Sequence, residues 1–228
     1  MPPRDEANRL KHFINHELLA PNVLTVPVDL GIVREFEQLA LTAQASPEFG
    51  TVTPDWDSDI RWISPVTKAG FEDFQSAFDR LDVARHVSDC LDLDRAVRLY
   101  VGFVCVRSQC DQANFHVDWA LTNNEGFTLL TPLSGCNGQK LLYRKMTGEV
   151  GEYSYRMGEG IIFGDHFRHS TPPGRWDPPF AFLAFNFGTD KMVHWDKLKK
   201  TTGAQCRLIR QPDGELVSID PRAMVAYA

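Results

Sequence analysis

Long apolar runs and a basic leader are both missing from this sequence. No window approaches the roughly 18 uninterrupted apolar residues that a membrane span needs. The first residues, Met1 to Glu6, do not show the basic and then apolar order of a signal peptide. We therefore expect no membrane partner and a cytoplasmic protein.

Cysteine and excess positive charge are also scarce. Among 228 residues there are only five cysteines, which are scattered and form no CxxC pair. This usage excludes a disulfide framework and a structural zinc site, so we expect free thiols. The formal net charge is −6, from 24 Lys and Arg against 30 Asp and Glu, and the only short basic run is Lys197–Lys200. Nucleic acid is therefore not an expected partner.

The apolar content that is present suits one folded domain. Hydrophobic residues make up 43% of the chain and aromatic residues 11%, which is ample for a core. Two stripes at nearly helical spacing precede residue 95. They comprise Ile32, Val33, Phe36, Leu39 and Leu41, and then Phe71, Phe74, Phe78, Leu81 and Ala84. We expect residues 1–94 to form a mostly helical annex, with Thr51–Pro65 as a long loop or a short edge hairpin.

From residue 95 the pattern changes to short β-rich segments separated by Gly, Asn and Pro. The expected strands are Ala96–Arg107, Phe127–Leu133, Gln139–Arg144, Glu149–Arg156, Gly160–Gly164 and Phe180–Phe187, with a turn-rich cluster at Ser134–Gly138. Strands spaced this evenly are typical of a sandwich or barrel. We expect a mainly β fold with flanking helices (α+β), built on a core over residues 95–190. The extension over residues 191–228 reads as a short helix and a hairpin turning at Pro212–Gly214.

The first segment with chemical content is Asn114–Trp119. Residues i and i+2 of an extended segment project to the same side, so His116 and Asp118 can converge on one point. An imidazole and a carboxylate, with one further histidine, can occupy one face of an octahedral metal site and leave three positions open. An HxD pair alone occurs by chance in many proteins, so a second motif is needed.

The second segment is Gly158–His169, a glycine-punctuated apolar strand followed by a turn and a histidine, about fifty residues after the HxD pair. Here residues 95–190 resemble the iron(II)/2-oxoglutarate-dependent dioxygenase superfamily. The resemblance implies a double-stranded β-helix, a jelly-roll or cupin-like barrel, and an iron(II) ion held by His116, Asp118 and His169. His166 is the competing third ligand, and the family spacing favours His169.

The resemblance also implies a cation that binds the C5 carboxylate of 2-oxoglutarate, on the strand after the late histidine. The corresponding window, Pro179–Leu183, contains no cation. The candidates for this role are Arg175, Lys140 and Arg98. We favour Arg175, because the Pro172–Gly174 turn before it and Trp176 after it could hold its guanidinium rigidly at the barrel mouth. There it could donate two parallel hydrogen bonds to a carboxylate.

Three further residues are candidates for the site. Trp119 follows the predicted metal ligand Asp118 and is expected either to line the substrate pocket, together with Asn114, or to pack in the core. Asn186 lies on the last predicted strand and, if it faces inward, must be hydrogen-bonded to the co-substrate or to the fold.

The resemblance implies an enzyme that hydroxylates an unactivated C–H bond. The short chain, with no obvious docking domain, favours a small-molecule substrate. Its cofactors would be iron(II) and 2-oxoglutarate, dioxygen would be the second substrate, and succinate and carbon dioxide would be the co-products. Two alternatives stay open. One is an iron-dependent oxidase or oxygenase on the same fold that does not use 2-oxoglutarate, and the other is a non-oxidative cupin-like metal-binding barrel.

Overall fold

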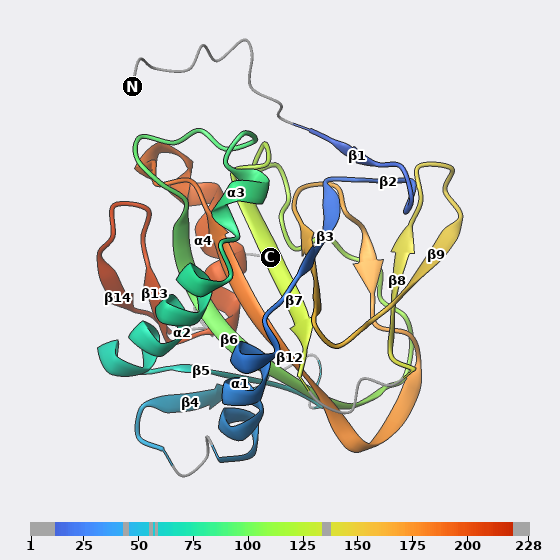
Figure 1. The fold of residues 1–228 in the computed structure, drawn as a ribbon, viewed down its shortest axis with the longest axis horizontal. Helices are drawn as coiled ribbons and strands as arrows, with labels where there is room; N and C mark the ends of the chain where they lie inside the picture. Colours follow the sequence, from blue (N-terminus) through green and yellow to red (C-terminus); the bar gives the residue numbers. More distant parts are fainter. Residues whose placement is uncertain (1–11, 43–45, 55–56, 58, 134–137, 221–228) are drawn as a thin grey trace.

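The computed structural model describes residues 12–42, 46–54, 57, 59–133 and 138–220. Its main feature is a seven-stranded antiparallel sheet with strand order β3-β10-β7-β12-β6-β5-β4 (Figure 1). The strands are β3 (Val23–Pro27), β4 (Phe49–Val52), β5 (Ile60–Pro65), β6 (Arg98–Cys110), β7 (Gly126–Pro132), β10 (Glu159–Phe163) and β12 (Gly174–Gly188). The long strands β6 and β12 form its centre, since β12 pairs with both β6 and β7.

A second, three-stranded antiparallel sheet has the order β11-β8-β9. It consists of β8 (Lys140–Arg144), β9 (Val150–Ser154) and the two-residue strand β11 (His169–Ser170). In Figure 1, β8 and β9 lie to the right of β6, β7 and β12, and α2 lies to the left. The two sheets enclose a largely aromatic core that includes Tyr143, Tyr155, Phe163, Phe180 and Phe182. This arrangement confirms the predicted double-stranded β-helix.

Helices cover the other face of the large sheet. Both α1 (Leu30–Thr42) and α2 (Lys68–Arg80) bury apolar residues against it, as the two stripes predict. Phe74 of α2 lies directly over Gly102 of β6, where an added Cβ would come within 2.2 Å of the ring. Phe78 contacts Phe185 of β12, with ring centroids 5.8 Å apart. The second stripe does not form one continuous helix. The helix α2 ends at Arg80, and the separate short helix α3 (Ala84–Val87) carries the end of the stripe.

The expectation of a mostly helical segment before residue 95 is wrong in part. β3 pairs with β10, and the β4–β5 hairpin extends the large sheet beyond β6, so the edge-hairpin alternative for Thr51–Pro65 is the correct one. The local sequence does not predict these strands, because β3 and β5 form hydrogen bonds with β10 and β6, which lie much later in the chain. Two further short strands, β1 (Ile14–Asn15) and β2 (Ala20–Pro21), pair with each other.

The C-terminal extension contains the predicted helix and hairpin. A 3-10 turn, η3 (Met192–His194), leads into α4 (Trp195–Gln205), and β13 (Leu208–Arg210) pairs with β14 (Leu216–Ser218). Trp195 and Leu198 of α4 pack in a third core cluster with Tyr100 of β6. The predicted cluster Ser134–Gly138 lies outside the described residues except for Gly138, whose φ of +81° marks a turn. Within the described residues, no helix is both long and apolar enough to cross a membrane.

Candidate metal centre

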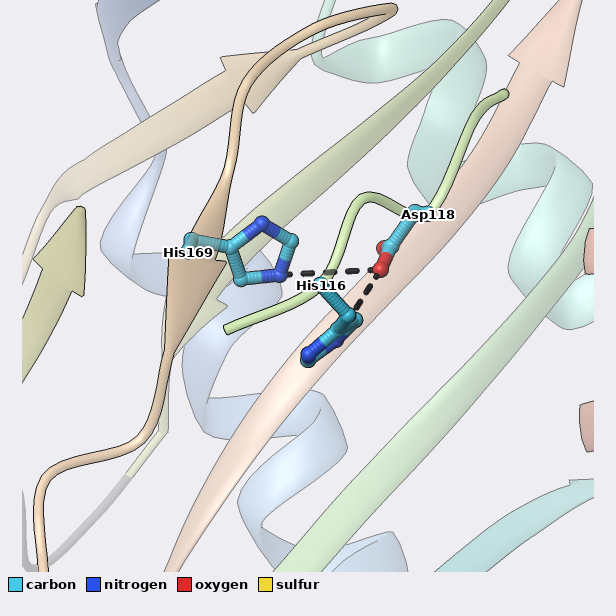
Figure 2. Close-up of side chains that lie close together, drawn as sticks. All are labelled: His116, Asp118 and His169. Carbon is cyan, nitrogen blue, oxygen red and sulfur yellow. Dashed lines mark ion pairs between the residues drawn. The ribbon is translucent and has the colours of Figure 1, made fainter. Parts of the chain in front are cut away.

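The two motifs found in the sequence are joined by a backbone bridge. His116 donates its N–H to the carbonyl of His169 at 3.0 Å, and the N–H of His169 donates to the carbonyl of His116 at 2.9 Å. This antiparallel pair extends the small sheet by one position beyond β11. The bridge sets the two histidines side by side, with ring centroids 4.6 Å apart, and Asp118 lies two residues after His116 (Figure 2).

Three side-chain atoms converge at this point. The Oδ1 atom of Asp118 lies 3.4 Å from Nε2 of His116 and 3.5 Å from Nε2 of His169 (Figure 2). All three ligand atoms lie within 4.8 Å of one another. Adjacent ligands of an octahedral ion, each about 2.1 Å from it, would be about 3 Å apart. The separations therefore suit one ion bound by all three groups after a small contraction.

Backbone carbonyls orient both imidazoles. Nδ1 of His116 lies 2.9 Å from the carbonyl oxygen of Asn114, and Nδ1 of His169 lies 3.1 Å from that of Phe167. A carbonyl can only accept a hydrogen bond, so each Nδ1 must carry the proton. The lone pair of each neutral ring then resides on Nε2, the atom that faces Asp118. This is the usual way in which a metal-binding histidine is held in the correct tautomer.

The charges within the triad are strongly coupled. Burial lowers the pKa of His116, but the hydrogen bond and negative charge of Asp118 outweigh it and leave that pKa raised. Burial raises the pKa of Asp118, yet the two histidines and the hydroxyl of Thr128 bring it below its ordinary value. The pKa of the deeply buried His169 is lowered, mainly by burial. Asp118 is thus an anion and His169 a neutral imidazole, as metal binding requires.

A second layer of polar groups supports Asp118. The Thr128 hydroxyl on β7 lies 3.3 Å from Oδ2 of Asp118 and 3.1 Å from Oδ1 of Asn186. It accepts a hydrogen bond from the indole nitrogen of Trp119 at 2.9 Å, and Asn186 donates to Gln205 on α4 at 2.8 Å. The large sheet and α4 therefore both fix the carboxylate.

A buried aspartate links the two segments that carry the ligands. Asp165 is 1% exposed and precedes His169 by four residues. Its carboxylate accepts hydrogen bonds from the Thr122 hydroxyl and, at 2.7 Å, from the N–H of Asn123. The N–H of Asp165 donates to the side-chain oxygen of Asn124 at 3.0 Å. Residues 122–124 belong to the loop after Asp118, so Asp165 joins that loop to the turn before His169.

The remaining predicted residues lie near the triad in different ways. Asn114 provides its backbone carbonyl to His116. Trp119 is fully buried, which supports core packing over a pocket wall, and Asn186 is fully buried and hydrogen-bonded within the fold. The turn residue His166 is exposed and contacts the ring of His12, with ring centroids 5.5 Å apart, so it does not join the triad.

The three predicted anchoring cations do not converge on the triad. Lys140 is exposed and lies 2.5 Å from the carboxylate of Glu152. Arg98 donates to the carbonyl of Pro212 at 3.1 Å and so faces the C-terminal hairpin. Arg175 is exposed near the start of β12.

The structure instead shows a partly buried cation that the sequence analysis does not select, Arg107 of β6. Its side chain is 13% exposed and lies 2.5 Å from the carboxylate of Asp57. It also donates to the hydroxyl of Thr171, two residues after His169, at 3.1 Å. The signal that could have found it is alternation along β6, since Arg107 follows the inward Phe103 and Cys105 by steps of two.

Solved structures share this fold. The chain is similar to the non-heme alpha ketoglutarate dependent epimerase SnoN from nogalamycin biosynthesis, with a TM-score of 0.59 and 12% identity over 74% of this chain and 79% of that chain. HygX from Streptomyces hygroscopicus, solved with nickel and 2-oxoglutarate bound, gives 0.57 and 15% over 80% and 90%. A prolyl hydroxylase from Trichoplax adhaerens, solved with a hypoxia inducible factor peptide fragment, gives 0.53 and 12% over 73% and 83%.

These similarities confirm, at the level of the fold, the resemblance that the two motifs indicate. No protein-family model matches the sequence, and no curated protein matches it. At such low identities the comparisons establish a shared double-stranded β-helix, and the activity has to be argued from the site.

Proposed function

We propose that this chain is a non-haem iron(II) oxygenase that uses 2-oxoglutarate as co-substrate and hydroxylates an unactivated C–H bond of a small molecule. The observation that carries the proposal is the convergence of Asp118 Oδ1 with Nε2 of His116 and of His169. Two imidazoles and one carboxylate are the ligand set of non-haem iron(II) oxygenases, which leave metal positions open. Two solved structures with the same fold, an alpha ketoglutarate dependent epimerase and HygX with nickel and 2-oxoglutarate bound, support the choice of co-substrate.

The residues fit such an ion in chemistry as well as in distance. Iron(II), when bound, would supply the redox centre at which dioxygen is reduced, with two electrons from the oxidative decarboxylation of 2-oxoglutarate and two from the C–H bond of the substrate. The chain itself holds both imidazoles in the correct tautomer, keeps Asp118 anionic and His169 neutral, and shapes access to the ion. The side chain of His169 is 7% exposed and that of His116 is 53% exposed. Substrate therefore approaches from the side of His116.

A small-molecule substrate is the narrower part of the proposal. HygX has been solved with hygromycin B, whereas the Trichoplax enzyme has been solved with a peptide. The fold thus accommodates both substrate classes. We also propose a cytoplasmic location, and the described cysteines Cys90, Cys105, Cys110 and Cys206 are free thiols, as a reducing compartment would leave them.

Two other functions compete with this one. An iron-dependent oxidase or oxygenase without 2-oxoglutarate would explain why Arg175, Lys140 and Arg98 do not face the triad. A cupin-like barrel with a purely structural metal would need the same three ligands. Two measurements, the binding of 2-oxoglutarate and the consumption of oxygen, distinguish both alternatives from the proposed function.

The test is a titration of the iron(II)-loaded protein with 2-oxoglutarate under argon. We expect a weak visible charge-transfer band in the wild type, because the oxo and C1 carboxylate oxygens chelate the iron. Asp118→Ala should give no band, because loss of one of three ligands removes most of the affinity for iron. A wild type that shows no band but consumes oxygen would support the oxidase. No band and no oxygen uptake would support the structural metal.

A further inference from the structure

Resting on the proposed function, we propose that Arg107 binds the distal carboxylate of the 2-oxo acid from β6, in competition with the resident carboxylate of Asp57. The cation would thus come from the strand next to β12 and not from β12 itself. The ligand class is a dicarboxylate that chelates the metal at one end and meets the guanidinium at the other.

The register of the large sheet places Arg107 on the inner face. Arg107 is directly opposite Phe180 on the neighbouring antiparallel strand β12. Cross-strand partners project to the same face of a sheet. Phe180 lies in the aromatic core between the two sheets, together with Phe163, whose ring centroid is 4.6 Å from that of His169. Arg107 therefore shares the compartment that the triad borders.

This position also accounts for the gap in the sequence pattern. The segment Pro179–Leu183 of β12, where the family resemblance implies a cation, provides only apolar side chains. Arg107 stands opposite Phe180, near the start of that segment, and supplies the missing charge at nearly the same place in the barrel. A carboxylate in such an apolar compartment is costly unless a cation is hydrogen-bonded to it.

The contacts of Arg107 hold it near the end of the strand that carries His169. Its Nε donates to the carbonyl of Gln109 at 2.8 Å, and one terminal nitrogen donates to the Thr171 hydroxyl at 3.1 Å. The other terminal nitrogen faces Asp57 at 2.5 Å. A guanidinium has five N–H donors, and these contacts use three of them. The side chain is thus fixed in place and retains the capacity to bind a second acceptor.

Asp57 gives the site a built-in competitor. Its side chain is 17% exposed, so the ion pair with Arg107 is largely shielded from water. A second anion that approaches the same guanidinium meets a cation already neutralised and is repelled by the charge of Asp57. Removal of the Asp57 charge should therefore strengthen dicarboxylate binding, whereas removal of the Arg107 charge should weaken it. The two changes have opposite signs, which a merely structural ion pair would not produce.

The experiment measures binding by calorimetry on nickel-loaded full-length protein, so that no turnover occurs. The two ligands are 2-oxoglutarate and 2-oxopentanoate, which has the same carbon chain but no distal carboxylate. For Arg107→Leu we expect the dissociation constant of 2-oxoglutarate to rise by about thirtyfold or more, with little change for 2-oxopentanoate. Arg107→Lys should recover part of the loss. Asp57→Asn should lower the constant, by up to about fivefold.

The control is Arg61→Leu, which removes an exposed arginine from the adjacent strand β5 and should leave both constants unchanged. Arg175→Leu represents the anchor favoured by the sequence, and a selective loss there instead would overturn the proposal. If Arg107→Leu does not fold, Arg107→Lys and Asp57→Asn still carry the test.

Different results would overturn the proposed function and the proposed role of Arg107. If the wild type binds 2-oxoglutarate and Arg107→Leu keeps the preference for it over 2-oxopentanoate, Arg107 is not the anchor and the proposed function stands. An unchanged or weaker affinity in Asp57→Asn overturns the competition. If the nickel-loaded wild type does not bind 2-oxoglutarate, the co-substrate assignment and the role of Arg107 are overturned together.

Discussion

At the scale of single residues, Thr128 connects the triad to the large sheet. Its hydroxyl oxygen accepts from Trp119 and its one proton is shared between the oxygens of Asp118 and Asn186. Partners of this kind hold a ligand in its binding orientation and typically contribute about ten- to a hundredfold to metal affinity. The orientation of the Asp118 carboxylate, a proposed metal ligand, therefore depends on a residue outside the triad.

We predict that Thr128→Val lowers the affinity for nickel or iron(II) by about tenfold or more, because Asp118 loses its hydroxyl partner. Thr128→Ser keeps the hydroxyl and should restore most of the affinity. Thr131→Val is the matched control, since Thr131 is a buried threonine on the same strand whose hydroxyl donates to the carbonyl of Glu159. Metal titration followed by calorimetry measures all three. A similar loss in Thr131→Val would mean that the effect reflects general damage to β7.

The contrast between the triad and Arg107 shows what the sequence can predict at this scale. The convergence of His116 and Asp118 follows from a local i, i+2 relation, and the choice of His169 follows from the family resemblance of the glycine-punctuated strand before it. The orientation of Arg107 depends on the register between β6 and β12, which are joined by a long stretch of intervening chain. Local patterning therefore predicts Arg98 as readily as Arg107, although only Arg107 faces the interior.

At the scale of elements, the site depends on the fit between the loop after Asp118 and the turn before His169. Asn123, Asn124 and His166 all have positive φ values, of 60°, 58° and 68°. Such conformations are costly for residues other than glycine, although asparagine tolerates them better than most. The hydrogen bonds of Asp165 to the loop offset this cost and keep the two segments in one relative position.

We predict that Asp165→Asn weakens metal binding by about tenfold and destabilises the fold by about 1–3 kcal/mol. The new amide N–H₂ faces donors that previously met a carboxylate oxygen, which leaves a buried donor unsatisfied. Ile32→Ala in α1 is a suitable control, because it should cost at least as much stability, about 2–5 kcal/mol, in a core cluster that does not include the triad. Urea unfolding and metal titration are measured for both. Equal metal affinities in the two variants would contradict a positioning role for Asp165.

The sequence predicts some helices and strands better than others. The six core strands and the C-terminal hairpin show local periodicity and turn residues, and the structure contains all of them. β3 and the β4–β5 hairpin are short, and their hydrogen-bond partners lie in β10 and β6. Nothing local distinguishes such edge strands from loops, so their place in the sheet emerges only when the whole sheet forms.

At the scale of the whole molecule, the triad joins the two sheets of the barrel. His169 belongs to β11 of the small sheet, and His116 is bridged to it by the backbone. Asp118 is held from the other side, by Thr128 of the large sheet and by Thr201 of α4, whose hydroxyl donates to the carbonyl of Asp118. An ion bound by all three side chains would therefore cross-link the two halves of the core.

We predict that metal binding stabilises the whole domain. A ligand that binds only the folded state at a free concentration of 100 times its Kd adds about 2.7 kcal/mol. For a domain of this size that corresponds to an increase in Tm of about 5–10 °C. Thermal unfolding with nickel should show this increase in the wild type, and excess chelator should reverse it.

The Asp118→Ala variant distinguishes stabilisation by an ion bound to the triad from stabilisation by metal ions bound non-specifically. Without the carboxylate, the ion loses its contact with the large sheet, and the two histidines that remain are adjacent residues of one backbone bridge. They can bind nickel weakly but cannot hold the sheets together, so the Tm of this variant should hardly change on metal addition. An increase as large as that of the wild type would mean that the stabilising ion binds elsewhere. The triad would then lose its role as the cross-link between the sheets, because the ion would stabilise the fold without Asp118.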